Sequence, residues 1–173
     1  MNIIIEEIDI TQYEPFEYIA KWSNDPDIKY FIGANFTEGE MPDCDPKKLY
    51  KSANESDNKH IYLIKDGDRP IGDLSIMIDP PHIKRKEKNT GWISICIGEK
   101  EYRGKGIAQT AMIYLENECR KLGLKRIELG VFEYNKRARA FYEKIGYKEF
   151  TRIKEFVYYQ GKWRADIRME KYL

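Results

Sequence analysis

A short turn rich in glycine and lysine constrains the fold of this chain more than any other segment: Arg103-Gly104-Lys105-Gly106-Ile107-Ala108. It separates residues 92–97, which have the composition of a buried strand, from residues 107–122, which carry apolar side chains at helical spacing. A turn that opens a helix in this way leaves backbone N–H groups unpaired at the positive end of the helix dipole. Such a helix start binds phosphate oxygens. The sequence therefore predicts a strand–turn–helix unit that holds a pyrophosphate.

Two common phosphate-binding loops do not match this turn. The nucleoside-triphosphate loop G-x-x-x-x-G-K-[ST] fails because the spacing from Gly98 is one residue too long. In addition, Gly106 follows Lys105 where that loop needs Ser or Thr. The dinucleotide fingerprint G-x-G-x-x-G is met by Gly104 and Gly106, but Gln109 occupies its third glycine position.

A second motif lies about one strand and one helix further along the chain. Residues 135–147 read N-x-x-A-x-x-F-Y-x-x-x-G-Y, and residues 103–108 read R-x-x-G-x-A. With both motifs in this order, the chain resembles the GNAT superfamily of acyl-coenzyme-A-dependent N-acetyltransferases. Its patterns are most similar to the subgroup with ribosomal-protein N-terminal, spermidine and aminoglycoside 6′-acetyltransferases. The resemblance covers nearly the whole chain and is loosest over residues 10–60.

The order of the expected elements gives the fold class α+β. We expect a mixed, mostly antiparallel central sheet with one central parallel β-α-β crossing and helices on both faces, as the resemblance also implies. One domain should span residues 1–173. Asp45 and Asn135 should cap helix starts, and Gly123 and Gly146 should end helices. The segments 27–45 and 79–89 are expected to be loops, the second a solvated one. Strands are expected at 3–8, 61–65, 71–78, 91–97, 124–131, 147–159 and 162–172, and helices at 13–23, 46–56, 107–122 and 135–145.

Composition excludes several classes of partner. A net charge of +1 gives no general attraction to nucleic acid or to a membrane surface. No run of about 18 apolar residues is present. Three unpatterned cysteines indicate free thiols in a reducing cytoplasm, and two distant histidines argue against a bound metal. A homodimer stays open.

The resemblance implies acetyl-coenzyme A as co-substrate and assigns a role to each part of the two motifs. The turn would hold the pyrophosphate, and the strand before it would bulge, splay from the next strand and pair with the pantetheine amides and the thioester oxygen. In the second motif, Asn135 would cap its helix and touch the cofactor, and Phe141 would serve as wall and core together. Tyr142 would protonate the departing thiolate, since a phenol stays protonated at neutral pH. The cofactor-binding set is Ile95, Cys96, Ile97, Arg103, Gly104, Lys105, Gly106, Ile107, Ala108, Asn135 and Phe141.

The general base is left open by the sequence. Many relatives place a carboxylate on the strand before the turn, but residues 92–98 contain none. Asp73, Glu133 and the acidic segment 38–45 remain as candidates, and a water chain would serve an amine of modest pKa. Cys96 is interpreted as an apolar strand residue and not as a nucleophile, because no histidine lies near it in sequence to activate it.

The predicted reaction is transfer of an acetyl group from acetyl-coenzyme A to a primary amine, by direct attack on the thioester. The acceptor would be a small polycationic molecule or a protein N-terminus. The alternative is a non-catalytic acyl-coenzyme-A sensor or interaction module. Six acidic residues should border the acceptor cleft and attract a cation, or else form a solvated loop without substrate contact: Asp25, Asp27, Glu38, Glu40, Asp43 and Asp45.

Overall fold

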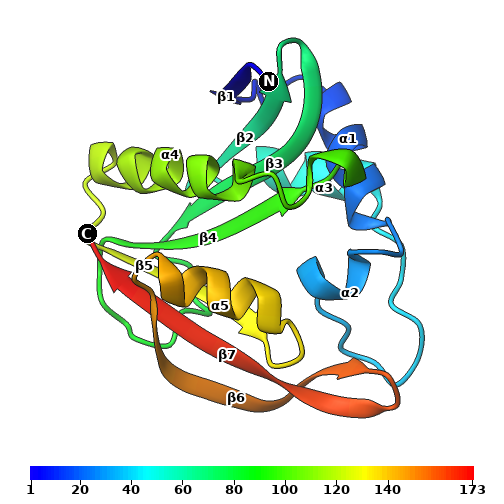
Figure 1. The fold of residues 1–173 in the computed structure, drawn as a ribbon, viewed down its shortest axis with the longest axis vertical. Helices are drawn as coiled ribbons and strands as arrows, with labels where there is room; N and C mark the ends of the chain where they lie inside the picture. Colours follow the sequence, from blue (N-terminus) through cyan, green and yellow to red (C-terminus); the bar gives the residue numbers. More distant parts are fainter.

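Seven strands form one mixed sheet with helices on both faces in the computed structural model, which describes residues 1–173 (Figure 1). The strand order is β1-β2-β3-β4-β5-β7-β6, in which β4 and β5 run parallel and all other neighbours run antiparallel. The crossing from β4 to β5 passes through α4. This arrangement confirms the predicted α+β class. The strands are β1 (Ile3–Glu7), β2 (Lys59–Asp66), β3 (Arg69–Ile78), β4 (Thr90–Ile97), β5 (Arg126–Phe132), β6 (Lys148–Tyr159) and β7 (Lys162–Tyr172).

The helix ends lie where local sequence signals place them. The side chain of Asp45 accepts a hydrogen bond from the Lys47 N–H at the start of α3, and Asn135 caps α5 in the same way. Gly123 and Gly146 follow α4 and α5 with φ of +76° and +97°, a conformation that glycine adopts at little cost. No helix is long and apolar enough to cross a lipid bilayer. The helices are α1 (Glu14–Ser23), α2 (Lys29–Ile32), α3 (Pro46–Asn54), α4 (Ile107–Lys121) and α5 (Lys136–Lys144), with a 3-10 helix at Lys100–Tyr102.

Two segments differ from the sequence-based prediction. The predicted loop 27–45 contains the single-turn helix α2, which has no side-chain cap and whose position is set by tertiary contacts. The 79–89 connection is not a purely solvated loop, because Ile83 is buried and the Lys84 N–H donates to Glu128 Oε1 at 2.8 Å. Its charged residues suggested full exposure, but one apolar residue and one backbone donor attach it to the sheet.

The sheet divides the apolar side chains into two layers. On one face, α4 and α5 pack over the main core, which includes Leu74, Leu115 and Leu129 (Figure 1). On the other face, α1 and α3 pack in two smaller clusters around Phe16 and Trp22. Because this second layer is small, it leaves room for polar side chains on that face of β3, β4, β5 and β7.

The contact of Trp22 with Gly98 fixes α1 against the end of β4. Trp22 is 1% exposed, and its Nε1 donates to Glu99 Oε1 at 2.8 Å. A Cβ built on Gly98 would lie 2.2 Å from atoms of the indole ring. Only a residue without a side chain therefore lets the ring lie against the backbone here.

We expect Gly98→Ala to lower the free energy of unfolding by about 1–3 kcal/mol, because the new methyl group overlaps a ring that cannot move outward. Urea unfolding measures the change. Gly39→Ala is the matched control, since no atom lies within 4 Å of its built Cβ, and it should alter stability by no more than about 1 kcal/mol. Equal stability of the two variants would contradict this packing.

Candidate active site

The parallel strands β4 and β5 separate after three residue pairs. Pairing covers Thr90–Trp92 with Arg126–Glu128, and both strands then continue without pairing to Ile97 and Phe132. Backbone groups that would form a ladder therefore face a gap. The predicted splay is confirmed. The predicted bulge is absent from the β3–β4 ladder, whose register runs without a shift, so the gap arises on the β5 side alone.

Arg103 occupies the end of this gap. Its Nε donates to the Ile97 carbonyl oxygen at 3.0 Å, and another of its nitrogens donates to the Gly98 carbonyl oxygen. The same guanidinium donates to Asp25 Oδ2 at 2.5 Å, which lowers the pKa of that carboxyl group. The side chain thus donates to two carbonyl oxygens at the end of β4, and its charge is paired with Asp25.

The turn after Arg103 presents unpaired backbone donors. Gly104 and Gly106 have φ of +81° and +80°, and Gly106 stands at the N-cap of α4 without a side-chain cap. The N–H groups of residues 104–108 donate no hydrogen bond within the protein. No atom lies within 4 Å of a Cβ built on Gly106, so the donors face open space. This arrangement suits an anion.

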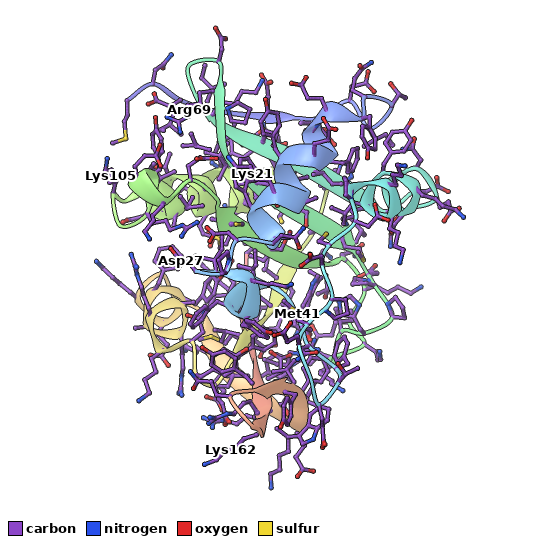
Figure 2. The ribbon with its side chains drawn as sticks, turned by 90° about the vertical axis from the view of Figure 1, so that its right-hand side faces the viewer. Lys21, Asp27, Met41, Arg69, Lys105 and Lys162 are labelled. Carbon is purple, nitrogen blue, oxygen red and sulfur yellow. The ribbon has the colours of Figure 1, made fainter.

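Two cations border the turn. Figure 2 shows Lys105 at the outer edge of the molecule beside α4, where its Nζ lies 5.6 Å from the Tyr102 ring centroid. Arg137 reaches the turn from the first turn of α5, since one of its guanidinium nitrogens lies 3.3 Å from a Cβ built on Gly104. Sequence reasoning missed Arg137, although it is a basic residue within the second motif, because only the fold brings α5 next to the turn.

The gap opens into a cavity of about 1030 Å³ on the α1 side of the sheet. Among the predicted site residues, Ile95, Cys96, Asn135 and Tyr142 line it. Ile97 and Phe141 pack against the main core and do not line it, and the 103–108 turn lies outside it. The cavity with Asn135 and Tyr142 is therefore separate from the neighbouring turn with its unpaired N–H groups.

Asn135 stands at the N-cap of α5, and Tyr142 lies in the last turn of this helix. The Tyr142 hydroxyl makes no hydrogen bond within the protein, and burial raises its pKa to about 12. The ring packs edge-on against Tyr147, with 5.8 Å between centroids. The Ala138 N–H donates to Asn135 Oδ1 at 3.2 Å, which confirms the predicted cap. Tyr142 is thus a neutral phenol in a packed position, and its hydroxyl proton has no acceptor within the protein.

Asp73 brings a carboxylate to the cavity from β3. It lies opposite Cys96 in the β3–β4 register and forms no ion pair or hydrogen bond within the protein. Burial raises its pKa to about 7, although the ammonium of Lys59 acts in the opposite direction. Glu133, the other single candidate for the base, does not line the cavity. The register between β3 and β4, which the sequence does not reveal directly, therefore makes Asp73 the candidate for the general base that lines the cavity.

Cys96 is a poor nucleophile in this setting. Burial raises the pKa of its thiol well above the usual value, and the Asp73 carboxylate raises it further. A thiol in such surroundings stays protonated and unreactive. This agrees with the interpretation of Cys96 as a strand residue.

The acidic segment of the sequence lies outside the cavity lining. Asp27 pairs with Lys100 at 2.6 Å, and Asp43 pairs with Lys29 at 2.7 Å. Glu38 accepts a hydrogen bond from Trp163 Nε1 at 2.9 Å. With Asp25 bound to Arg103 and Asp45 capping α3, Glu40 alone of the six has no partner. These charges interact with the protein's own loops. This favours the interpretation of the acidic segment as a solvated loop without substrate contact over that of a cation-binding wall.

Comparisons with known proteins agree with this geometry. The family model of the acetyltransferase (GNAT) family matches residues 13–147. An N-acetyltransferase 9-like protein of Caenorhabditis briggsae is 25% identical over 161 residues, which cover 87% of this chain and 79% of the relative.

Solved structures share the fold. The spermidine N-acetyltransferase of Vibrio cholerae, in complex with CoA and spermine, has a TM-score of 0.78 at 20% identity, covering 99% of this chain and 95% of the other. The ribosomal-protein-alanine N-acetyltransferase of Brucella melitensis has a TM-score of 0.76 at 17% identity, covering 98% and 99%.

Proposed function

The chain belongs to the GNAT family of acetyltransferases, and on this basis we propose that it transfers an acetyl group from acetyl-coenzyme A directly to a primary amine that enters the cavity beside Asp73 and Tyr142. The single observation that carries this proposal is the presence, in one cavity, of an unpaired carboxylate with a pKa of about 7 and an unpaired phenol with a pKa of about 12. One can take a proton and the other can give one at neutral pH.

The residues around the gap fit acetyl-coenzyme A. The unpaired N–H groups of residues 104–108, with Lys105 and Arg137 beside them, would hold the pyrophosphate. Arg103 would support the turn instead of touching a phosphate, because its guanidinium is bound to Asp25 and to carbonyl oxygens. The free edges of residues 95–97 and of β5 would pair with the amides of the pantetheine arm, beside Asn135.

Acetyl-coenzyme A supplies the acyl carbon and a thiol leaving group. The carboxylate of Asp73 takes a proton from the amine as its nitrogen forms the new amide bond. The hydroxyl of Tyr142 gives its proton to the sulfur as the carbon–sulfur bond breaks. Solvent then returns one proton to Tyr142 and removes one from Asp73. No side chain is acylated, in keeping with the protonated thiol of Cys96.

We propose a primary amine of a small molecule or of a protein N-terminus as the acceptor. The solved neighbours that act on spermidine and on a ribosomal protein support both classes. A polycation receives no support from residues 25–45, whose acidic groups are mostly paired outside the cavity. The complete acid–base pair also argues against a purely non-catalytic sensor.

The turn should control affinity for acetyl-coenzyme A. Gly106→Val should raise the dissociation constant about 10- to 100-fold, because valine resists φ of +80° and its side chain blocks approach to the N–H groups. Arg137→Ala should raise it about tenfold through loss of a charged donor. Calorimetry measures both. Arg139→Ala on the same helix is the control, since its guanidinium pairs with Glu143 at 3.0 Å. Equal affinity of all three variants would remove the turn from the site.

A thiol-release assay with a panel of primary amines tests the reaction itself. Tyr142→Phe should lower kcat about 10²-fold and leave the dissociation constant of acetyl-coenzyme A unchanged, because it removes only the proton donor. Tyr172→Phe is the control, since Tyr172 is 57% exposed and does not line the cavity. No thiol release with any amine would overturn the proposed function, whereas full activity of Tyr142→Phe would leave protonation of the thiolate to water.

The pH dependence should report the ionisation of Asp73. As pH rises through about 7, this carboxyl group loses its proton, so kcat/KM of the wild type should rise more steeply below pH 7 than above it, where only deprotonation of the amine still contributes. Asp73→Asn should be slower by about 10²-fold at pH 7 and should show only the shallower rise, up to the pKa of the amine. Glu133→Gln should keep the wild-type profile, because Glu133 lies outside the cavity lining. An unchanged profile in Asp73→Asn would exclude Asp73 as the base.

A further inference from the structure

One buried carboxylate oxygen in the structure has no hydrogen-bond partner. Asp166, on β7, is 2% exposed, and its Oδ2 accepts a hydrogen bond from Arg168 Nε at 2.7 Å. Its Oδ1 is the one side-chain nitrogen or oxygen that is completely shielded from solvent and lacks a partner. A carboxylate oxygen removed from water without a donor is destabilising, and native proteins rarely keep one without a reason. A donor from a bound molecule would satisfy it.

Asp166 lines the same cavity as Asp73 and Tyr142. Gly130 on β5 makes room for it, because a Cβ built there would lie 2.8 Å from Oδ1 and 2.9 Å from Oδ2. The same Cβ would lie 3.1 Å from the ring of Trp92, which also lines the cavity. Asp166 and Trp92 are therefore part of a polar and aromatic wall across the gap from Asp73, and Oδ1 lies just behind this wall, against Gly130.

The charges around Asp166 decide which kind of donor fits. Asp166 belongs to a chain of ion pairs in which three carboxylates alternate with three guanidinium groups, so the chain is balanced: Asp166, Arg168, Glu128, Arg126, Glu170 and Arg85. Lys84 and Lys86 also line this end of the cavity and add two positive charges. A further ammonium group would be repelled by this net positive charge. A neutral O–H or N–H donor would not be repelled.

Resting on the proposed function, we propose that Asp166 Oδ1 forms a second acceptor subsite, which accepts a hydrogen bond from a neutral hydroxyl group carried by the amine substrate. A hydroxyl group fits best because it can donate to Oδ1 and accept from a neighbouring cation such as Arg168. Trp92 and Phe156, which both line the cavity, give its carbon skeleton an apolar wall.

The spacing of the strands sets the length of the acceptor. Asp73 and Asp166 lie on β3 and β7, with β4 and β5 between them. Three strand steps of about 4.8 Å would place them on the order of 14 Å apart in a regular sheet, and the separation of β4 from β5 adds to this distance. Each of the two hydrogen bonds to the substrate takes up about 3 Å, so the hydroxyl group should lie on the order of 10 Å from the reacting nitrogen. The substrate is thus an extended amino alcohol and not a compact amine.

Three matched series of primary amines test this inference: ω-amino alcohols, alkylamines and diamines, with chains that place the far group from about 5 to about 14 Å from the reacting nitrogen. For the wild type, kcat/KM should peak at an intermediate length for the amino alcohols and exceed that of the equally long alkylamine by about tenfold or more. The diamine should show no such gain.

Asp166→Asn should abolish the preference of the amino alcohol over the alkylamine, because an amide N–H would face the hydroxyl group or the acceptor atom would turn away. Gly130→Ala should reduce the same ratio by pushing the Asp166 oxygens aside, and it keeps every charge. Calorimetric binding of the best amino alcohol to each protein without acetyl-coenzyme A gives a readout independent of turnover. The thermal midpoint of each variant shows that it is folded.

The outcomes separate the two proposals. Acetylation of amines without any preference for the hydroxyl group, or with a preference that survives in both variants, overturns the subsite and leaves the acetyltransferase assignment intact. A preference for diamines over amino alcohols also overturns it, because the site would then hold an ammonium group. Absence of acetylation across all three series counts against the proposed function itself, and the calorimetric binding then decides the subsite alone.

Discussion

The separation of β4 from β5 after three residue pairs is the constraint on which the rest of the site depends. A continuous ladder would satisfy every backbone group and leave neither a gap nor a cavity. Arg103 supplies donors to the carbonyl oxygens of Ile97 and Gly98, and Asp166 with Trp92 occupies the space above Gly130. The polar groups that remain free along the gap are available to a bound molecule.

Burial raises the pKa of both proposed reactive groups, the Asp73 carboxyl group and the Tyr142 phenol, and both changes suit the proposed reaction. Removal from water disfavours the charged form of an acid, so it raises the pKa of the Asp73 carboxyl group and of the Tyr142 phenol together. For the carboxyl group this brings the pKa close to neutral pH, where it accepts protons best. For the phenol it secures the proton that a departing thiolate needs. The same environment keeps Cys96 a thiol, so one physical effect accounts for the base, the acid and the absence of a nucleophile.

The sequence predicted what short-range chemistry determines. Caps such as Asn135 and the left-handed glycines after α4 and α5 depend on a few neighbouring residues, and they lie where expected. The turn of residues 103–108 and Tyr142 were found in the same way, through local motifs. The helix α2 was missed because no local signal marks it, and the attachment of Ile83 was missed because its neighbours are charged.

The rest of the candidate site depends on register, which a single sequence does not state. The residues around Asp73 alternate as in any half-buried strand, so the local sequence does not mark it. Only its pairing opposite Cys96 places it in the cavity. Asp166 and Arg168 alternate with Ile167, as charged residues do on a solvated face. Both are nevertheless buried, because Arg168 is covered by Glu128, by the His82 carbonyl oxygen and by the Trp92 ring. Conversely, the acidic residues 25–45 look like a cation-binding wall in the sequence, but all except Glu40 are bound by lysines, Arg103, Trp163 or backbone groups. Charge that is counted along a chain thus says little about a cavity until the partners of each group are known, and in this protein the carboxylates that matter are Asp73 and Asp166, which line the cavity and each keep an unpaired oxygen.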